Sequence, residues 1–219
     1  DIWVMVLGVE EGGQLGRLRL SAFVNYFDAY QRGNEPLPGL VDPTQRDFRL
    51  GEVGLRLTSG RSYSGALQGI DGGVDVLGQL FQFKPDNNYT YLAPSLQPRL
   101  TLRWHRGDPE LGQDFDLSLT GRFDYRRYPL EARGPGTGRD DAFLQGGATL
   151  GVTGAVLAQL GYLFQGNLST LTDESYQRHV LMAKVAVRVP WELYLTCKGQ
   201  LNIFQSLRPA DAPPPPQAN

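Results

Sequence analysis

Apolar and polar residues alternate strictly along Asp114–Tyr125, and this alternation predicts a β-strand. Positions of one parity hold Asp, Ser, Thr and Arg, whereas the positions between them hold Phe, Leu, Gly and Tyr. Successive side chains of a strand point to opposite faces. One face of this strand is therefore charged, and the other is apolar and aromatic. A strand of this length can also cross a bilayer when it is tilted.

The same two-residue period recurs along most of the chain and predicts ten strands. They are expected at Ile2–Val9, Arg17–Tyr26, Phe48–Thr58, Val74–Phe83, Leu96–His105, Asp114–Tyr125, Ala142–Val152, Val156–Phe164, His179–Val189 and Leu193–Ile203. Three details stand out. The alternation slips near Leu77, which predicts a bulge. Tyr63–Ile70 is a candidate eleventh strand. Ile2–Val9 is apolar on both of its faces.

The predicted connections are alternately short and long. Thr153–Gly154 is short, for example, whereas Arg127–Asp140 is long. Membrane barrels have short turns on one rim and long loops on the other. We therefore expect residues 1–206 to form an all-β, antiparallel transmembrane β-barrel of about ten strands (range 8–12), apolar outside and polar inside. This count places both ends of the barrel on the long-loop rim. The Pro-rich segment 207–219 is expected to be a disordered tail.

Two segments resemble the strand-and-loop rhythm of bacterial outer-membrane β-barrels. Gly161–Ser169 is typical of a strand that leaves into a polar loop, and Tyr176–Met182 is typical of the return into the next strand. The resemblance extends over Asp114–Phe204. It implies an integral protein of the outer membrane of a Gram-negative bacterium, in contact with membrane lipid. Because it is a resemblance of pattern, it assigns no functional residues.

Composition limits the classes of function and of structural site that the chain can have. The net charge of −2 and the pI of about 5.7 give no indication of nucleic-acid binding. No apolar run reaches the 18 residues of a transmembrane helix. The single cysteine, Cys197, excludes an intrachain disulfide, and the absence of a Cys/His cluster predicts no zinc site. No cofactor is expected.

The polar faces of the predicted strands carry more basic than acidic residues. The candidates to line the lumen are Arg56, Arg99, Arg103, Asp116, Arg122, Asp124, Lys184, Arg188 and Lys198. A barrel of about ten strands is narrow. We therefore expect these charges to pair across the lumen and to fill it, because an unpaired charge in a confined interior is costly. The alternative is a narrow path that favours small anions.

Catalysis has little support in the sequence. His105 lies at the end of a predicted strand, and His179 lies close to Glu174 and Ser175. A Ser/His/acid hydrolase needs a histidine that takes the serine proton, but the chain contains no Gly-x-Ser-x-Gly motif. We expect no enzymatic activity, with a barrel-embedded hydrolase as the remaining alternative. Arg106-Gly107-Asp108 is typical of a turn.

The expected function is a non-catalytic structural or docking subunit of a cell-envelope assembly, and the alternative is a narrow pore for small anionic solutes. Protein partners are expected at Ile2–Val9, whose second apolar face needs cover, or at the Pro-rich tail. The rival fold is a soluble β-sandwich or lipocalin-like barrel with its apolar faces turned inward. The concentration of Arg on the polar faces argues against that rival, because a soluble surface normally carries more Lys and Glu.

Overall fold

The computed structural model describes residues 2–31, 48–83, 90–107, 112–129, 138–154, 156–171, 174–189 and 193–207. These residues form ten strands: β1 (Ile2–Leu15), β2 (Leu18–Gln31), β3 (Phe48–Ser62), β4 (Leu67–Phe83), β5 (Tyr91–Arg106), β6 (Gln113–Tyr128), β7 (Arg139–Thr153), β8 (Val156–Ser169), β9 (Tyr176–Val189) and β10 (Leu193–Ser206). All ten predicted strands are found. The described part of the chain contains no helix with the length and hydropathy needed to span a bilayer. Residues 208–219 of the Pro-rich tail lie outside the described residues.

The strands form one antiparallel sheet in which each strand pairs with the next one along the chain. This order follows from the short connections, because a strand that is joined to its predecessor by a few residues pairs with it most easily. Gly16, with a φ of 61°, allows the tight turn between β1 and β2. The strand bounds confirm that short and long connections alternate, so that the short ones lie along one rim of the sheet.

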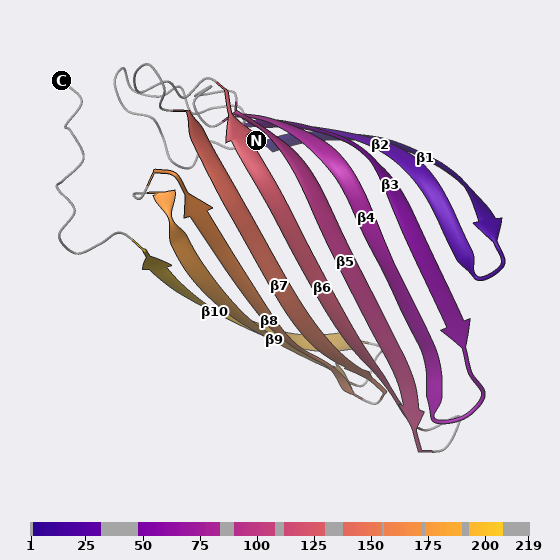
Figure 1. Cartoon of the computed structure of the whole chain (residues 1–219). Coiled ribbons are helices and arrows are strands. Elements are labelled where there is room, and N and C mark those ends of the chain that lie inside the picture. The colour runs from indigo at the N-terminus through magenta and orange to yellow at the C-terminus, as the bar shows by residue number, and fades with distance from the viewer. Residues whose placement is uncertain are drawn as a thin grey trace.

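The sheet is open. Strands β1 and β10 are its two edges, and they do not pair with each other in the described part of the chain. Figure 1 shows a curved sheet with these two strands on opposite sides. The predicted closed barrel is therefore not formed in this structure, because the curvature built up over nine strand pairings leaves the edges apart. Strand β1 begins and β10 ends on the rim of the long connections, as the ten-strand count predicted.

Two predicted details of the β3–β4 region are wrong. β4 pairs regularly with both neighbours at Leu77, and its irregularity lies between Leu67 and Gly69. Leu77 keeps the alternation but is an apolar side chain on the polar face, where it is only 6% exposed. No eleventh strand forms at Tyr63–Ile70, because the chain turns there and the Tyr63 N–H donates to the Gln68 carbonyl at 3.0 Å. The end of that segment belongs to β4.

The two faces of the sheet differ throughout. The polar face carries the buried polar side chains of Ser21, Asp75, Gln79, Ser95, Asp124, Asp141 and Asn167, whereas the apolar face carries exposed side chains such as Val9, Val24, Val53, Leu119, Leu160 and Leu195. In a single-layer sheet a side chain is shielded only by neighbours on its own face. The burial of polar groups therefore indicates that the polar face is the concave one, where side chains converge.

Candidate functional site

Ion pairs on the polar face join the N-terminal strands. The Arg56 guanidinium of β3 lies 3.0 Å from the Asp75 carboxylate of β4 and 2.8 Å from the Glu10 carboxylate of β1. Arg99 of β5 approaches the same Asp75 carboxylate at 3.5 Å. The Ser21 hydroxyl also donates to Glu10 at 2.5 Å. Five strands are thus linked through two carboxylates, so Arg56 and Arg99 of the predicted lumen set are partnered.

A second cluster surrounds Asp124, whose exposure is 0%. Its carboxylate accepts hydrogen bonds from Arg122 (2.7 Å) and Arg126 (3.1 Å) of its own strand and from the Ser95 hydroxyl of β5 (2.6 Å). Arg122 also donates to the Gln79 side chain at 2.7 Å. A buried carboxylate needs such partners, because desolvation of an unpaired charge is costly. These contacts pair charges along the polar face of neighbouring strands, and the pairing of charges across a closed lumen stays a prediction.

A third cluster lies at the long-connection rim. Arg139 of β7 pairs with Asp141 at 2.7 Å, and Asn167 of β8 donates to the same carboxylate at 3.0 Å. The Arg139 guanidinium also lies 4.2 Å from the ring centroid of Tyr128, a cation–π geometry. Arg139, Asp141 and Asn167 are all buried in this cluster.

Aromatic rings run across the polar face next to these clusters. Phe27, Phe48, Phe81 and Tyr91 stack in succession on β2 to β5 with centroid distances of 5.0–5.4 Å, and Tyr128 of β6 continues the row. Ring contacts, in addition to ion pairs, therefore hold β2 to β6 together near the rim of the long connections. Phe48 and Phe81 lie inside the predicted strands, whereas Phe27, Tyr91 and Tyr128 lie beyond the predicted strand ends. The alternation pattern therefore did not place the five rings together.

The remaining predicted lumen residues differ in their partners. Arg103 pairs with Asp71 of β4, and Asp116 lies opposite Arg103 in the β5–β6 register. Lys184 of β9 and Lys198 of β10 lie directly opposite each other. The side chain of Arg188 lies outside the described part. The structure therefore brings the candidate residues onto one face but divides them into paired arginines and facing lysines.

Several functional partners were missing from the predicted set. Asp75, Asp71 and Glu10 supply the carboxylates for the arginines, and Arg126 and Asp141 extend the clusters. The alternation of β6 continues to Arg126, so a longer reading of that strand would have found it. The acids of β4 were hidden by the apparent slip near Leu77. Which acid meets which base depends on strand register, which alternation does not determine.

The two histidines do not share a site. His105 of β5 lies on the polar face with its Nδ1 2.7 Å from the Asp114 carboxylate, whereas His179 of β9 lies on the apolar face with its Nδ1 2.8 Å from the Tyr162 hydroxyl. No group of three or more His, Cys, Asp or Glu side chains suited to a metal ion occurs among the described residues.

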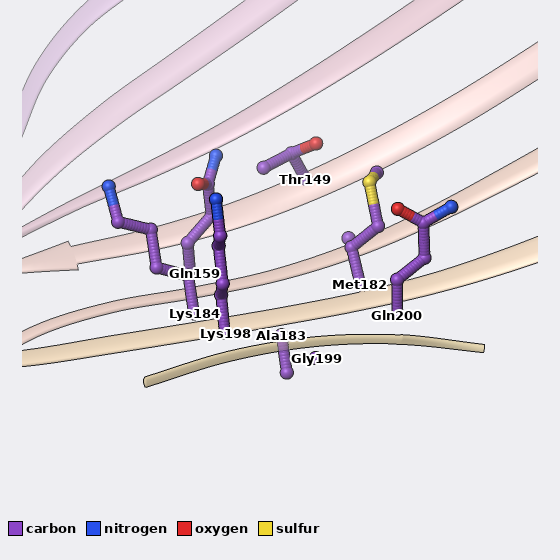
Figure 2. A pocket seen from close by; sticks show the side chains of 9 residues that line it. Thr149, Gln159, Met182, Ala183, Lys184, Lys198, Gly199 and Gln200 are labelled. Atoms are coloured by element: carbon purple, nitrogen blue, oxygen red, sulfur yellow. The ribbon is translucent and has the colours of Figure 1, made fainter. Parts of the chain in front are cut away.

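A cavity of about 430 Å³ lies on the polar face near the β10 edge. Figure 2 shows that Lys184, Lys198, Gln159 and Gln200 project from one side of the sheet, whereas Ala183 points to the other side. The lining is completed by Thr149, Gly161, Met182 and Gly199. The cavity is thus lined by ammonium, amide and hydroxyl groups.

Comparisons of the chain with profiles of known protein families, with curated proteins and with solved structures gave no match.

Proposed function

We propose that this chain is an integral outer-membrane β-barrel protein that serves, without catalysis, as a structural or docking subunit of a cell-envelope assembly. The observation that carries the proposal is the exposed apolar face. Val9 is 73% exposed and Leu195 is 69% exposed, at opposite edges of the sheet, and exposed Leu and Val side chains continue on the strands between them. A soluble monomer rarely exposes an apolar patch larger than several hundred Å², whereas hydrocarbon solvates such a face.

The height of the apolar face fits a bilayer. On β6 the apolar positions run from Phe115 to Tyr125. These ten residue steps of about 3.3 Å, at a tilt of about 40°, give a band roughly 25 Å tall, which is the height of the lipid-facing band of membrane barrels. Trp104 and Phe115 stack at 5.5 Å at its short-connection end, where aromatic residues suit the membrane interface.

A membrane location requires the sheet to close, because lipid cannot satisfy the backbone groups of an open edge. Strands β1 and β10 run in opposite directions, so they can pair antiparallel. The registers of the nine strand pairs connect Leu15 of β1, strand by strand, to Leu201 of β10. Barrel tilts of about 35–45° correspond to offsets of roughly 10–14 residues per circuit for ten strands. An offset of about 10 residues places Met5 opposite Leu201.

Val4 and Val6 of β1 and Phe204 of β10 are exposed apolar side chains on the polar face near the same rim. Closure with Met5 opposite Leu201 places Phe204 opposite Ile2, whereas Val4 and Val6 then lie opposite Asn202 and Gln200. The same surfaces are the docking sites for a partner protein if the edges meet that protein instead.

Membrane association is tested with a pair of neighbouring substitutions. Leu119, 40% exposed, lies on the apolar face, and Thr120 lies on the polar face opposite Arg99. Leu119→Arg should lower stability by roughly 2–4 kcal/mol if it lies at the bilayer midplane and should reduce the amount recovered in washed membranes, whereas Thr120→Arg should be tolerated better. Recovery of the native chain as a detergent-free soluble monomer would refute the proposal, as would equal effects of the two substitutions.

The second candidate function is a narrow path for small anions. It is favoured by the charge of the C-terminal strands. Strands β1–β7 hold as many arginines as acidic residues, whereas β8–β10 contain Arg178, Lys184, Arg188 and Lys198 and no Asp or Glu. A wall with one sign of charge concentrates counter-ions next to it.

A further inference from the structure

We infer that Lys184 and Lys198 form a binding site for a small organic anion that carries a phosphate or carboxylate group. The two lysines lie directly opposite each other on β9 and β10. Like charges in this position repel and destabilise a strand pair, and an anion between the two ammonium groups reverses that effect. The inference goes beyond the structural role proposed above, and it holds for a sheet in membrane or in detergent.

Neither lysine has an ion pair with a carboxylate in the described part of the chain, in contrast to the arginines of the other strands. The closest acidic position in the same row of the sheet is Asp116, which precedes Lys184 by three strands through Gly151 and Gln159. Three strand spacings of about 4.8 Å separate the backbones of Asp116 and Lys184 by roughly 14 Å, and the Asp116 carboxylate extends over Gly151 of β7. Asp116 and Lys184 both line a smaller cavity of about 200 Å³, but Lys198 lies one strand further away.

Closure of the sheet does not supply the missing acid. With Met5 opposite Leu201, Lys198 faces Gly8, and the nearest acidic residue of β1 on this face is Glu10. The Glu10 carboxylate is already bound by Arg56 at 2.8 Å and by the Ser21 hydroxyl at 2.5 Å. The lysines therefore keep their charge available for a ligand.

The surroundings of the lysines suit an organic anion. The cavity of about 430 Å³ offers the amides of Gln159 and Gln200 and the hydroxyl of Thr149 as further polar groups, and Met182 as an apolar contact. Figure 2 shows these side chains on the same side of the sheet as the two ammonium groups. Lysine is a compact point charge with freely rotating donors and binds phosphate well. Arg56, Arg103, Arg122 and Arg139 instead bind carboxylates of the protein itself.

The site is tested on the purified full chain in detergent with pyridoxal phosphate as the probe. A lysine Nζ attacks the aldehyde carbon and water leaves, which forms an imine. Added borohydride then delivers hydride to the imine carbon while solvent protonates the nitrogen, and mass spectrometry locates the stable amine. The chain has only one other lysine, Lys84, which serves as an internal control, and pyridoxal without phosphate is the control probe.

We expect pyridoxal phosphate to modify Lys184 or Lys198 on the order of tenfold more than pyridoxal does, with no such preference at Lys84. Inorganic phosphate or succinate should protect the pair, and the better competitor identifies the preferred group. In Lys184→Gln the preference at Lys198 should disappear, whereas Lys184→Arg, which keeps the charge, should retain it. Equal modification of all three lysines by the two probes overturns the site, and so does a lack of protection by both competitors.

Discussion

At the residue scale, the interior depends on a few carboxylates that each hold several donors. Asp124 accepts from two arginines and a serine while it is fully buried. The carboxylate and its donors stabilise one another, because the loss of one partner leaves the remaining buried charge without compensation for its desolvation. The packing of the polar face is therefore set by charge pairing as well as by ring stacking.

Replacement of Asp124 by Asn should destabilise the protein by about 3–5 kcal/mol, because the guanidinium groups of Arg122 and Arg126 lose their counter-charge. The matched control is Asp114→Asn on the same strand and face. The Asp114 side chain is 59% exposed where it contacts His105, so its loss should matter little. Urea unfolding of the detergent-solubilised protein gives both values. If the two variants unfold at the same urea concentration, the buried network does not stabilise the interior.

The sequence predicted the faces of the candidate site but not its pairs. Alternation placed Arg56, Arg122, Asp124 and Lys184 on one face correctly, because parity follows from the strand period. It could not show that Arg56 meets Asp75 and Glu10 from two other strands. Those contacts depend on the offset between strands, and each offset is set by turn length and packing.

At the element scale, the paired strands β1 and β2 approach each other closely at Gly12, which lies opposite Ser21. A Cβ added at Gly12 would lie 2.4 Å from the Leu20 carbonyl oxygen and 2.5 Å from the Ser21 Cβ, whereas one added at Gly13 meets nothing within 4 Å. Gly12→Ala should therefore cost about 1–3 kcal/mol through overpacking, and Gly13→Ala should be neutral or slightly stabilising. Urea midpoints of the two variants check this difference, and a neutral Gly12→Ala would mean that the hairpin is less tightly paired.

All ten strands could be predicted from the sequence, because a two-residue period is a strong local signal. Their ends could not. Predicted Ile2–Val9, for example, extends to Leu15 as β1, because backbone pairing with β2 continues through Gly12 and Gly13, where no side chain marks the alternation. The pattern also could not show whether β1 and β10 meet, because closure depends on the summed curvature of the whole sheet.

Edge pairing can be tested with the native Cys197 on β10. If Met5 lies opposite Leu201, Cys197 lies opposite Val9. Paired antiparallel residues have Cα atoms about 4.5–5.5 Å apart, which is within reach of a disulfide. Oxidation of Val9→Cys in detergent should therefore give an intramolecular crosslink, and Leu15→Cys, on the same strand and face but outside the paired stretch, should not. Crosslinking at Leu7→Cys instead indicates an offset larger by two residues. A crosslinked dimer shows that two copies pair, and the absence of an intramolecular crosslink at both Leu7 and Val9 rules out closure with an offset of about 10–12 residues.

At the scale of the whole molecule, the open sheet has an exposed apolar face and an opposite, ion-paired face on which polar side chains are buried. The paired charges are concentrated on β1–β7, whereas the basic wall lies on β8–β10. This asymmetry separates the two candidate functions. A structural subunit requires only the ion-paired strands β1–β7. A conducting protein also requires an open path beside the basic side chains of β8–β10.

Conductance in a planar bilayer decides between these functions. We expect the native chain to show little or no conductance, because a ten-stranded barrel is narrow and because carboxylates of the same or the adjacent strand neutralise Arg56, Arg122 and Arg139 on the polar face. If the basic wall borders a continuous path, the protein should instead conduct with a preference for anions. Lys198→Glu should then shift the reversal potential toward cations. Lys84→Glu, which changes the charge equally outside the described residues, is the matched control. A steady anion-selective current that responds to Lys198→Glu but not to Lys84→Glu would replace the structural role with that of a pore. The two substitutions change the net charge equally, and only a charge beside the path of the ions can alter their selectivity.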